Sequence, residues 1–286
     1  MKRIHTLVTC MAAALLVTVS CNKPVEPGTI AVFLGDKTSY WETMADAITD
    51  EAYLYNAENV VKFHFSDDAG GTAAMTEAMK SLSGISDLKG IIFTPSFEGA
   101  EDALADAVRS LGVPIVVVDK FLTTESPLLK LHCSQVFTSD KQEAINLYDI
   151  ARNNFITHMM IVSSRDERSK TRAGAVTSLD EDAEYVEIDA SAASTQLAAA
   201  LEEHPETDGV IIMDGSIVDN ALLDVLDGIK VYTFDVSQTI YDAIISGKVV
   251  GALVPDVDTI GRLAVRFVFS KTTDGASVVN AIYMTL

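Results

Sequence analysis

The chain has 286 residues and a formal net charge of −20, from 21 Lys and Arg against 41 Asp and Glu. This acidity argues against a protein that holds nucleic-acid phosphates, because such proteins need a basic surface. Hydrophobic residues make up 48% of the chain, which argues against disorder, and three cysteines are too few for a disulfide scaffold. At this length we expect about two domains.

Residues 1–21 have the pattern of an export signal. Two basic residues precede an uncharged, largely apolar run at 7–19, which is too short to span a bilayer. A small residue followed by Cys21 resembles the lipobox of bacterial lipoproteins, although Thr18 stands where that motif usually has Leu. The resemblance implies cleavage before Cys21 and lipidation of that residue; the alternative is an ordinary cleaved signal. We expect residues 22–28, with two Pro and one Gly, to form a tether.

From Thr29 onward, patterns typical of strands and helices alternate along the chain. Short apolar runs ended by Gly, Pro or Asp predict strands, and apolar residues at helical spacing predict helices. The predicted strands are 29–34, 60–65, 90–94, 115–118, 158–162, 185–188, 210–213, 230–234, 249–254 and 278–284. The predicted helices are 40–55, 75–82, 98–110, 140–153, 169–179, 192–203, 216–227, 237–246 and 257–270.

Residues 120–138 interrupt this alternation and show no long period. The interruption divides the pattern into two series of strands and helices. Alternating strands and helices are typical of a parallel sheet that helices cover on both faces. We therefore predict an α/β protein with two doubly wound parallel-sheet lobes.

The usual catalytic and cofactor motifs are absent from the sequence. It contains no GxGxxG after the first strand, no complete P-loop, no GxSxG elbow and no HExxH. With Cys21 lipidated and the signal removed, Cys133 is the one remaining thiol, so a zinc cluster is not expected. Its apolar neighbours predict a buried structural thiol. We expect no enzymatic activity, no cofactor and no metal.

Several polar and aromatic residues follow the predicted strands, where open parallel sheets bind their ligands. Tyr and Trp rings can cover the apolar face of a sugar, and carboxylates and basic groups can pair with its hydroxyls. Trp41 could instead belong to the core, and Asp119 or Asp235 could simply cap a loop. The candidate ligand-binding residues are Thr38, Tyr40, Trp41, Phe97, Asp119, Lys120, Arg172, Asp214 and Asp235.

A series of segments across about residues 29–285 resembles one known family in order and spacing. The segments are TIAVFL followed by Ser39-Tyr40-Trp41, GIIFTP at 90–95, GVPIVVVDK at 112–120, Thr138-Ser139-Asp140, Arg172-Ala173-Gly174, VYTFD at 231–235 and VPDVDTIGRLAV at 254–265. The family is that of the type I periplasmic binding proteins, which includes ribose- and galactose-binding proteins and the ligand domains of lactose-repressor-like regulators.

The resemblance implies two lobes that a three-strand hinge joins and that close on a ligand. By this resemblance, Arg172 and Asp235 match ligand-binding positions of the family. The implied crossovers lie near 136–139, 252–255 and 276–279, the first lobe comprises 29–137 plus 254–277, and the second comprises 138–253 plus 278–286.

The resemblance also implies a function. We expect a lipid-anchored periplasmic solute-binding protein, monomeric, that takes a monosaccharide-like ligand and serves an ABC-type permease or a membrane sensor. A ligand domain of a transcription regulator is disfavoured, because an export signal stands where a DNA-binding segment would be. Departures from the family at Thr38, Lys120, Asp214 and Leu253 keep a non-sugar small molecule as the alternative ligand.

Overall fold

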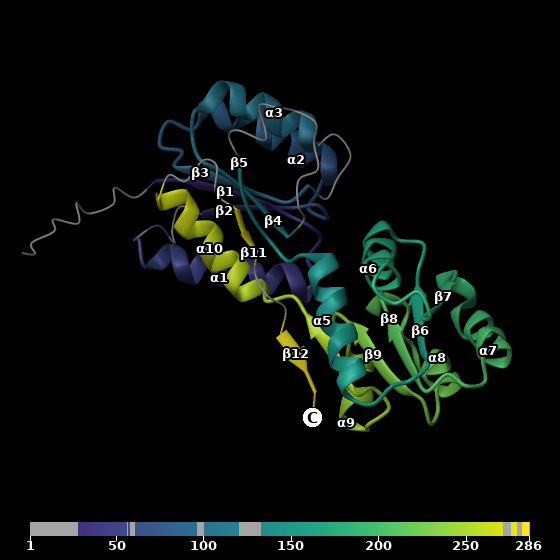
Figure 1. Cartoon of the computed structure of the whole chain (residues 1–286). Coiled ribbons are helices and arrows are strands. Elements are labelled where there is room, and N and C mark those ends of the chain that lie inside the picture. The colour runs from purple at the N-terminus through teal and green to yellow at the C-terminus, as the bar shows by residue number, and fades with distance from the viewer. Residues whose placement is uncertain are drawn as a thin grey trace, which may run out of the picture.

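Strand pairing divides the protein into two sheets. The computed structural model describes residues 28–55, 57, 61–95, 100–119, 133–270, 276–278 and 282–285. Among these residues, twelve strands form two six-stranded sheets. Figure 1 shows the sheets as two lobes, and we name them the first and the second lobe in chain order.

The first lobe contains a fully parallel sheet with the order β11-β5-β4-β3-β1-β2. Val32 of β1 pairs with Phe63 of β2 on one side and with Ile92 of β3 on the other. The strands are β1 (Ile30–Leu34), β2 (Val61–Phe65), β3 (Gly90–Phe93), β4 (Ile115–Asp119), β5 (Cys133–Phe137) and β11 (Ala276–Val278).

Helices cover both faces of this sheet. In β1, Ile30, Val32 and Leu34 face one apolar cluster, and Ala31 and Phe33 face another, because successive side chains of a strand point to opposite faces. The first face packs against α1 (Ser39–Tyr53) and α10 (Val257–Ser270), which lie side by side in Figure 1. The opposite face packs against α2 (Gly71–Ser81), the short 3-10 helix η2 (Leu82–Gly84) and α3 (Ala100–Leu111).

The second lobe repeats this topology with the order β12-β10-β9-β8-β6-β7. Its strands are parallel except for β12, which is antiparallel to β10. In both sheets the strand order reverses beside the lobe's own first strand, β1 or β6. The strands are β6 (Met159–Ser163), β7 (Glu184–Glu187), β8 (Gly209–Ile212), β9 (Lys230–Phe234), β10 (Gly251–Val254) and β12 (Ile282–Met284).

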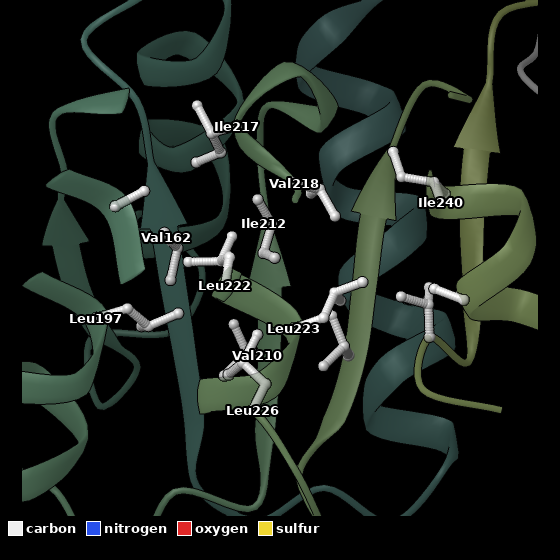
Figure 2. Close-up of a cluster of buried hydrophobic side chains, with 14 of the residues drawn as sticks. Val162, Leu197, Val210, Ile212, Ile217, Val218, Leu222, Leu223, Leu226 and Ile240 are labelled. Carbon is white, nitrogen blue, oxygen red and sulfur yellow. The ribbon is translucent and has the colours of Figure 1, made fainter. Parts of the chain in front are cut away.

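Two apolar clusters also flank the second sheet. One lies against α5 (Asp140–Asn153) and α6 (Glu167–Thr177). Figure 2 shows the other, in which Val162, Ile212 and Leu222 point toward one another between strands and helices. The elements on that side are η3 (Ala190–Ala192), α7 (Ala193–Glu203), η4 (Gly215–Ile217), α8 (Asn220–Val225) and α9 (Gln238–Ile245).

Among the described elements, the chain passes between the lobes three times. It leaves the first sheet after β5 and enters α5 of the second lobe. It returns after β10 to form α10 on the first lobe, and it passes from β11 in one sheet to β12 in the other. The predicted fold class of two doubly wound lobes is therefore confirmed.

The structure differs from the predicted elements at three places. Strand β5 lies in the stretch for which we predicted no element, because polar Ser134 and Gln135 interrupt its apolar pattern. The single predicted strand 278–284 is two short strands in different sheets. The predicted helix 216–227 is a 3-10 turn followed by α8, because Asp219 caps the backbone N–H of Leu222 and starts a new helix there.

Cys133 begins β5 and is a buried, free thiol, as the sequence predicts. Burial raises the pKa of this thiol to about 12, so it stays protonated and unreactive at neutral pH. None of the helices that the structure describes has the length and apolar character needed to cross a membrane.

Candidate functional site

Two aspartates occupy equivalent places in the two lobes. Asp119 is the last residue of β4, and Asp235 directly follows β9, the corresponding strand of the second sheet. Both have left-handed backbones, with φ of 71° for Asp119 and 61° for Asp235. This conformation is costly for residues other than Gly, although Asp tolerates it better than most. Both residues lie at the carboxyl ends of their strands, where parallel sheets place their binding sites.

In the first lobe, Asp119 is bound by Tyr40. The hydroxyl of Tyr40, in the first turn of α1, donates a hydrogen bond to Oδ1 of Asp119, which is 3% exposed. Burial and the adjacent charge of Asp119 hold the pKa of Tyr40 well above its usual value of 10.0. The phenol therefore stays a hydrogen-bond donor at any physiological pH.

Arg168, which the sequence analysis did not select, joins the two lobes. It lies near the start of α6, with Nη1 3.8 Å from Oδ1 of Asp119 and Nε donating to Oδ1 of Asp140 over 2.6 Å. Burial alone would lower the pKa of Arg168, but the Asp119 and Asp140 carboxylates outweigh that effect and raise it. One signal pointed to it: Arg168 and Arg172 are four residues apart and share one face of a helix.

Arg172 lies beside Asp235, but Arg172 itself is buried, with an exposed fraction of 2%. Its guanidinium stacks on the ring of Phe234, 3.9 Å from the ring centroid. Nη1 donates to the carbonyl of Met213 over 3.1 Å and lies 3.7 Å from Oδ2 of Asp235. On its other side, Nη2 is 3.7 Å from buried Glu143. Arg172 therefore supports the carboxylate of Asp235 from inside the lobe.

The two acidic candidates of the second lobe differ in whether their carboxylate oxygens can accept a further hydrogen bond. Both oxygens of Asp214 are engaged: Oδ2 accepts from the Ser164 hydroxyl over 2.5 Å, and Oδ1 accepts from the Ser216 backbone and hydroxyl. The side chain of Asp235 is 43% exposed. Partial desolvation raises the pKa of Asp235; Arg172 opposes the rise and the charge of Asp214 adds to it. Asp235 is thus the carboxylate with room for a further partner.

The remaining candidates lie elsewhere. Thr38 is the exposed N-cap residue of α1 and makes no capping hydrogen bond with its side chain. Trp41 is 9% exposed and belongs to the core cluster under α1, where its indole packs on Gly35. Phe97, Lys120 and Cys21 fall outside the residues that the structure describes.

The structure therefore brings together five residues, which we call the lobe junction. Within the described ranges, no group of three or more His, Cys, Asp or Glu side chains is placed to hold a metal ion. The junction offers two carboxylates, two guanidinium groups and one phenol hydroxyl. Its members are Tyr40, Asp119, Arg168, Arg172 and Asp235.

The fold has many solved relatives, although no protein-family model and no curated protein matches the sequence. A periplasmic ribose ABC transporter protein from Conexibacter woesei is 13% identical, with a TM-score of 0.75 over 92% of this chain and 93% of that one. AraP, an arabinose-binding protein from Geobacillus stearothermophilus, is 14% identical, with a TM-score of 0.72 over 91% and 97%.

The same fold also occurs outside transport. A protein from Bacteroides fragilis described as a LacI transcriptional regulator is 15% identical, with a TM-score of 0.66 over 90% of this chain and 97% of that one. At these sequence identities the similarity shows the fold alone, and function has to be inferred from the residues of the site. The chain has the type I periplasmic binding protein fold.

Proposed function

We propose that this protein is a solute-binding protein that takes a monosaccharide-like ligand at the lobe junction. The observation that carries the proposal is the convergence of one paired carboxylate from each lobe. Asp119 comes with Tyr40 from the first lobe, and Asp235 comes with Arg172 from the second. Both carboxylates lie at the strand ends where doubly wound sheets bind ligands.

The residue types suit a neutral, polyhydroxylated molecule. A sugar hydroxyl both donates and accepts, so it can donate to the half-exposed carboxylate of Asp235 while it accepts from a guanidinium such as that of Arg168. Hydrogen bonds to charged groups contribute about 1.5–3 kcal/mol each. Asp119 and Arg168 together supply both signs of charge for this purpose, and Tyr40 adds a neutral hydroxyl.

The comparisons support the same class of ligand. Two solved proteins of this fold are described as a periplasmic ribose ABC transporter and as an arabinose-binding protein. We propose the corresponding role here: delivery of the ligand to an ABC-type permease, or its presentation to a membrane sensor, in the periplasm.

A thermal-shift screen of residues 22–286 against sugars, polyols, nucleosides and amino acids tests the proposed ligand class. A ligand present at 100 times its Kd adds about 2.7 kcal/mol to the free energy of unfolding, which raises the melting temperature measurably. We expect a sugar or polyol to give the largest shift. A shift with nucleosides or amino acids alone would replace the sugar by a non-sugar ligand, and no shift with any compound would contradict the proposal.

The membrane anchor is a separate part of the proposal and rests on the N-terminal sequence. We propose that Cys21 carries the lipid and that residues 22–28 tether the lobes to the membrane. The test is to express the full chain and its Cys21→Ser variant and to compare membrane and soluble fractions. We expect the variant to leave the membrane fraction; a variant that stays there would refute the anchor without touching the ligand site.

A further inference from the structure

Arg168 contacts three different parts of the molecule through three different nitrogen atoms. Its Nε donates to Asp140, the first residue of α5 in the second lobe, over 2.6 Å. Its Nη2 donates to the hydroxyl of Thr138, in the crossover between β5 and α5, over 3.5 Å. Its Nη1 lies 3.8 Å from Asp119 in the first lobe. The guanidinium thus touches both lobes and the chain that links them.

The position of Arg168 is itself fixed by its neighbours in the second lobe. The Asp166 carboxylate caps α6 by accepting from the backbone N–H of Arg168 over 2.9 Å. The carboxylate oxygen of Asp140 that binds Arg168 also lies 3.2 Å from Nε of Arg172. The side chain is therefore held by the second lobe and extends toward the first.

The partners of Arg168 in the first lobe and in the crossover are covered by protein. Asp119 and Thr138 are each 3% exposed. A charge pair that water reaches poorly is stronger than an exposed one, and it depends on the two groups keeping their distance. A rotation of one lobe against the other would separate Arg168 from Asp119 and leave that carboxylate with the Tyr40 hydroxyl as its remaining described partner.

We propose that Arg168 is a positioning residue that sets the angle between the two lobes by clamping Asp119 and Thr138 to α5 and α6. A lysine cannot do the same, because one ammonium group replaces three nitrogen atoms that point to three separate partners. The clamp acts on the arrangement of the lobes whatever molecule binds between them. The proposal can therefore be tested independently of the proposed sugar ligand.

Small-angle X-ray scattering of the unliganded protein tests this inference. Residues 22–286 are used, because the elements of both sheets and the four apolar clusters lie within them. We expect Arg168→Gln and Arg168→Lys to shift the radius of gyration to a larger value than that of the wild type. Scattering curves that superpose on the wild type would overturn the clamp.

Two further variants separate the clamp from a general loss of stability. Asp119→Asn removes the charge across the lobes while retaining the shape, and Asn tolerates the left-handed backbone of that position, so it gives the same test if Arg168 variants fail to fold. We expect it to expand the molecule as well. Arg165→Gln is the matched control, because exposed Arg165 pairs with Asp189 and Glu187 inside the second lobe.

The pattern across the variants decides the assignment. Expansion of both the Arg168 and the Asp119 variants, with Arg165→Gln unchanged, supports the clamp. Expansion of the Arg168 variants alone would overturn it, because the contact with Asp119 is the one that crosses the lobes. Equal expansion of Arg165→Gln would also overturn it, since any loss of positive charge near α6 would then have the same effect.

Discussion

The hydroxyl of Tyr40 donates a hydrogen bond to the carboxylate of Asp119, a residue 79 positions further along the chain. The bond joins the first turn of α1 to the end of β4, and it leaves Tyr40 oriented at the edge of the first sheet. It forms because the strand order brings the ends of β1 and β4 to one edge, with only β3 between them. A buried carboxylate with a fixed donor is the first requirement of the proposed site.

Replacement of Tyr40 by Phe removes this donor while it retains the ring. We expect the free energy of unfolding to fall by about 1–3 kcal/mol, because the buried Asp119 carboxylate loses a hydrogen bond. Urea unfolding at neutral pH measures the change. Tyr241→Phe is the control, because Tyr241 is exposed on α9, and it should leave stability unchanged. Equal effects of the two variants would contradict the role of the hydrogen bond.

Arg172→Ala is expected to unfold the second lobe readily rather than to impair binding alone. The guanidinium is covered by protein, stacks on Phe234 and faces buried Glu143, so its loss removes the stacking and leaves Glu143 without its cationic partner. Breaking such a pair costs about 3–5 kcal/mol. Arg109→Ala, which breaks an exposed pair with Asp106, should cost about 0–1 kcal/mol. Similar losses in urea unfolding for the two variants would refute the buried role of Arg172.

Glu143 gives the second lobe a pH-dependent stability. Burial raises the pKa of Glu143 from 4.5 to about 7, with Arg172 opposing the rise. Between these two values the folded state holds more protons than the unfolded state. The free energy of unfolding therefore falls as pH rises through this window, by up to about 1.4 kcal/mol per pH unit.

Glu143→Gln should remove this contribution. In urea unfolding at pH 5, 6, 7 and 8, we expect the variant to gain stability relative to the wild type as the pH rises from about 5 to about 7 and to gain no more above that. Glu77→Gln, at an exposed position on α2, serves as the control. A difference between Glu143→Gln and the wild type that is constant with pH would contradict the raised pKa.

Two glycines of the second lobe should respond in opposite ways to Ala. A Cβ on Gly215 would lie 2.2 Å from the backbone oxygen of Phe234, so the turn between Asp214 and α8 would have to move. We expect Gly215→Ala to cost about 1–3 kcal/mol in unfolding measurements. Gly174 lies within α6 with open space around it, and Gly174→Ala should add up to about 1 kcal/mol. A neutral Gly215→Ala would show that η4 and the end of β9 do not meet closely there.

Most of the fold was predictable because its strands carry strong local signals. Runs such as 30–34 and 115–119 are buried on both faces of their sheets, so they are continuously apolar and end at Gly or Asp. The two Asp residues at strand ends could be selected for the same reason. Strand β5 escaped prediction because its neighbours β4 and β11, rather than an apolar sequence, give it its place.

The site was less predictable than the fold, because its contacts connect distant parts of the chain. Arg168 meets Asp119 across the lobes and Asp140 within its own lobe, and no local pattern distinguishes it from Arg172 on the same helix. Trp41 has the type of side chain that stacks on sugars. Because Gly35 has no side chain, however, the Trp41 ring fits into the core. Contacts between distant segments decided the case of Arg168 and burial decided that of Trp41, and both are properties of the folded chain.

Calorimetric titration at the lobe junction tests the central claim most directly. The sugar that gives the largest thermal shift is titrated into residues 22–286 of the wild type, of Asp235→Asn and of the Arg165→Gln control. We predict one binding site in the wild type, affinity at least about tenfold weaker in Asp235→Asn through the loss of a charge-assisted hydrogen bond, and no change in the control. Equal affinity in the wild type and Asp235→Asn would contradict ligand binding at this junction.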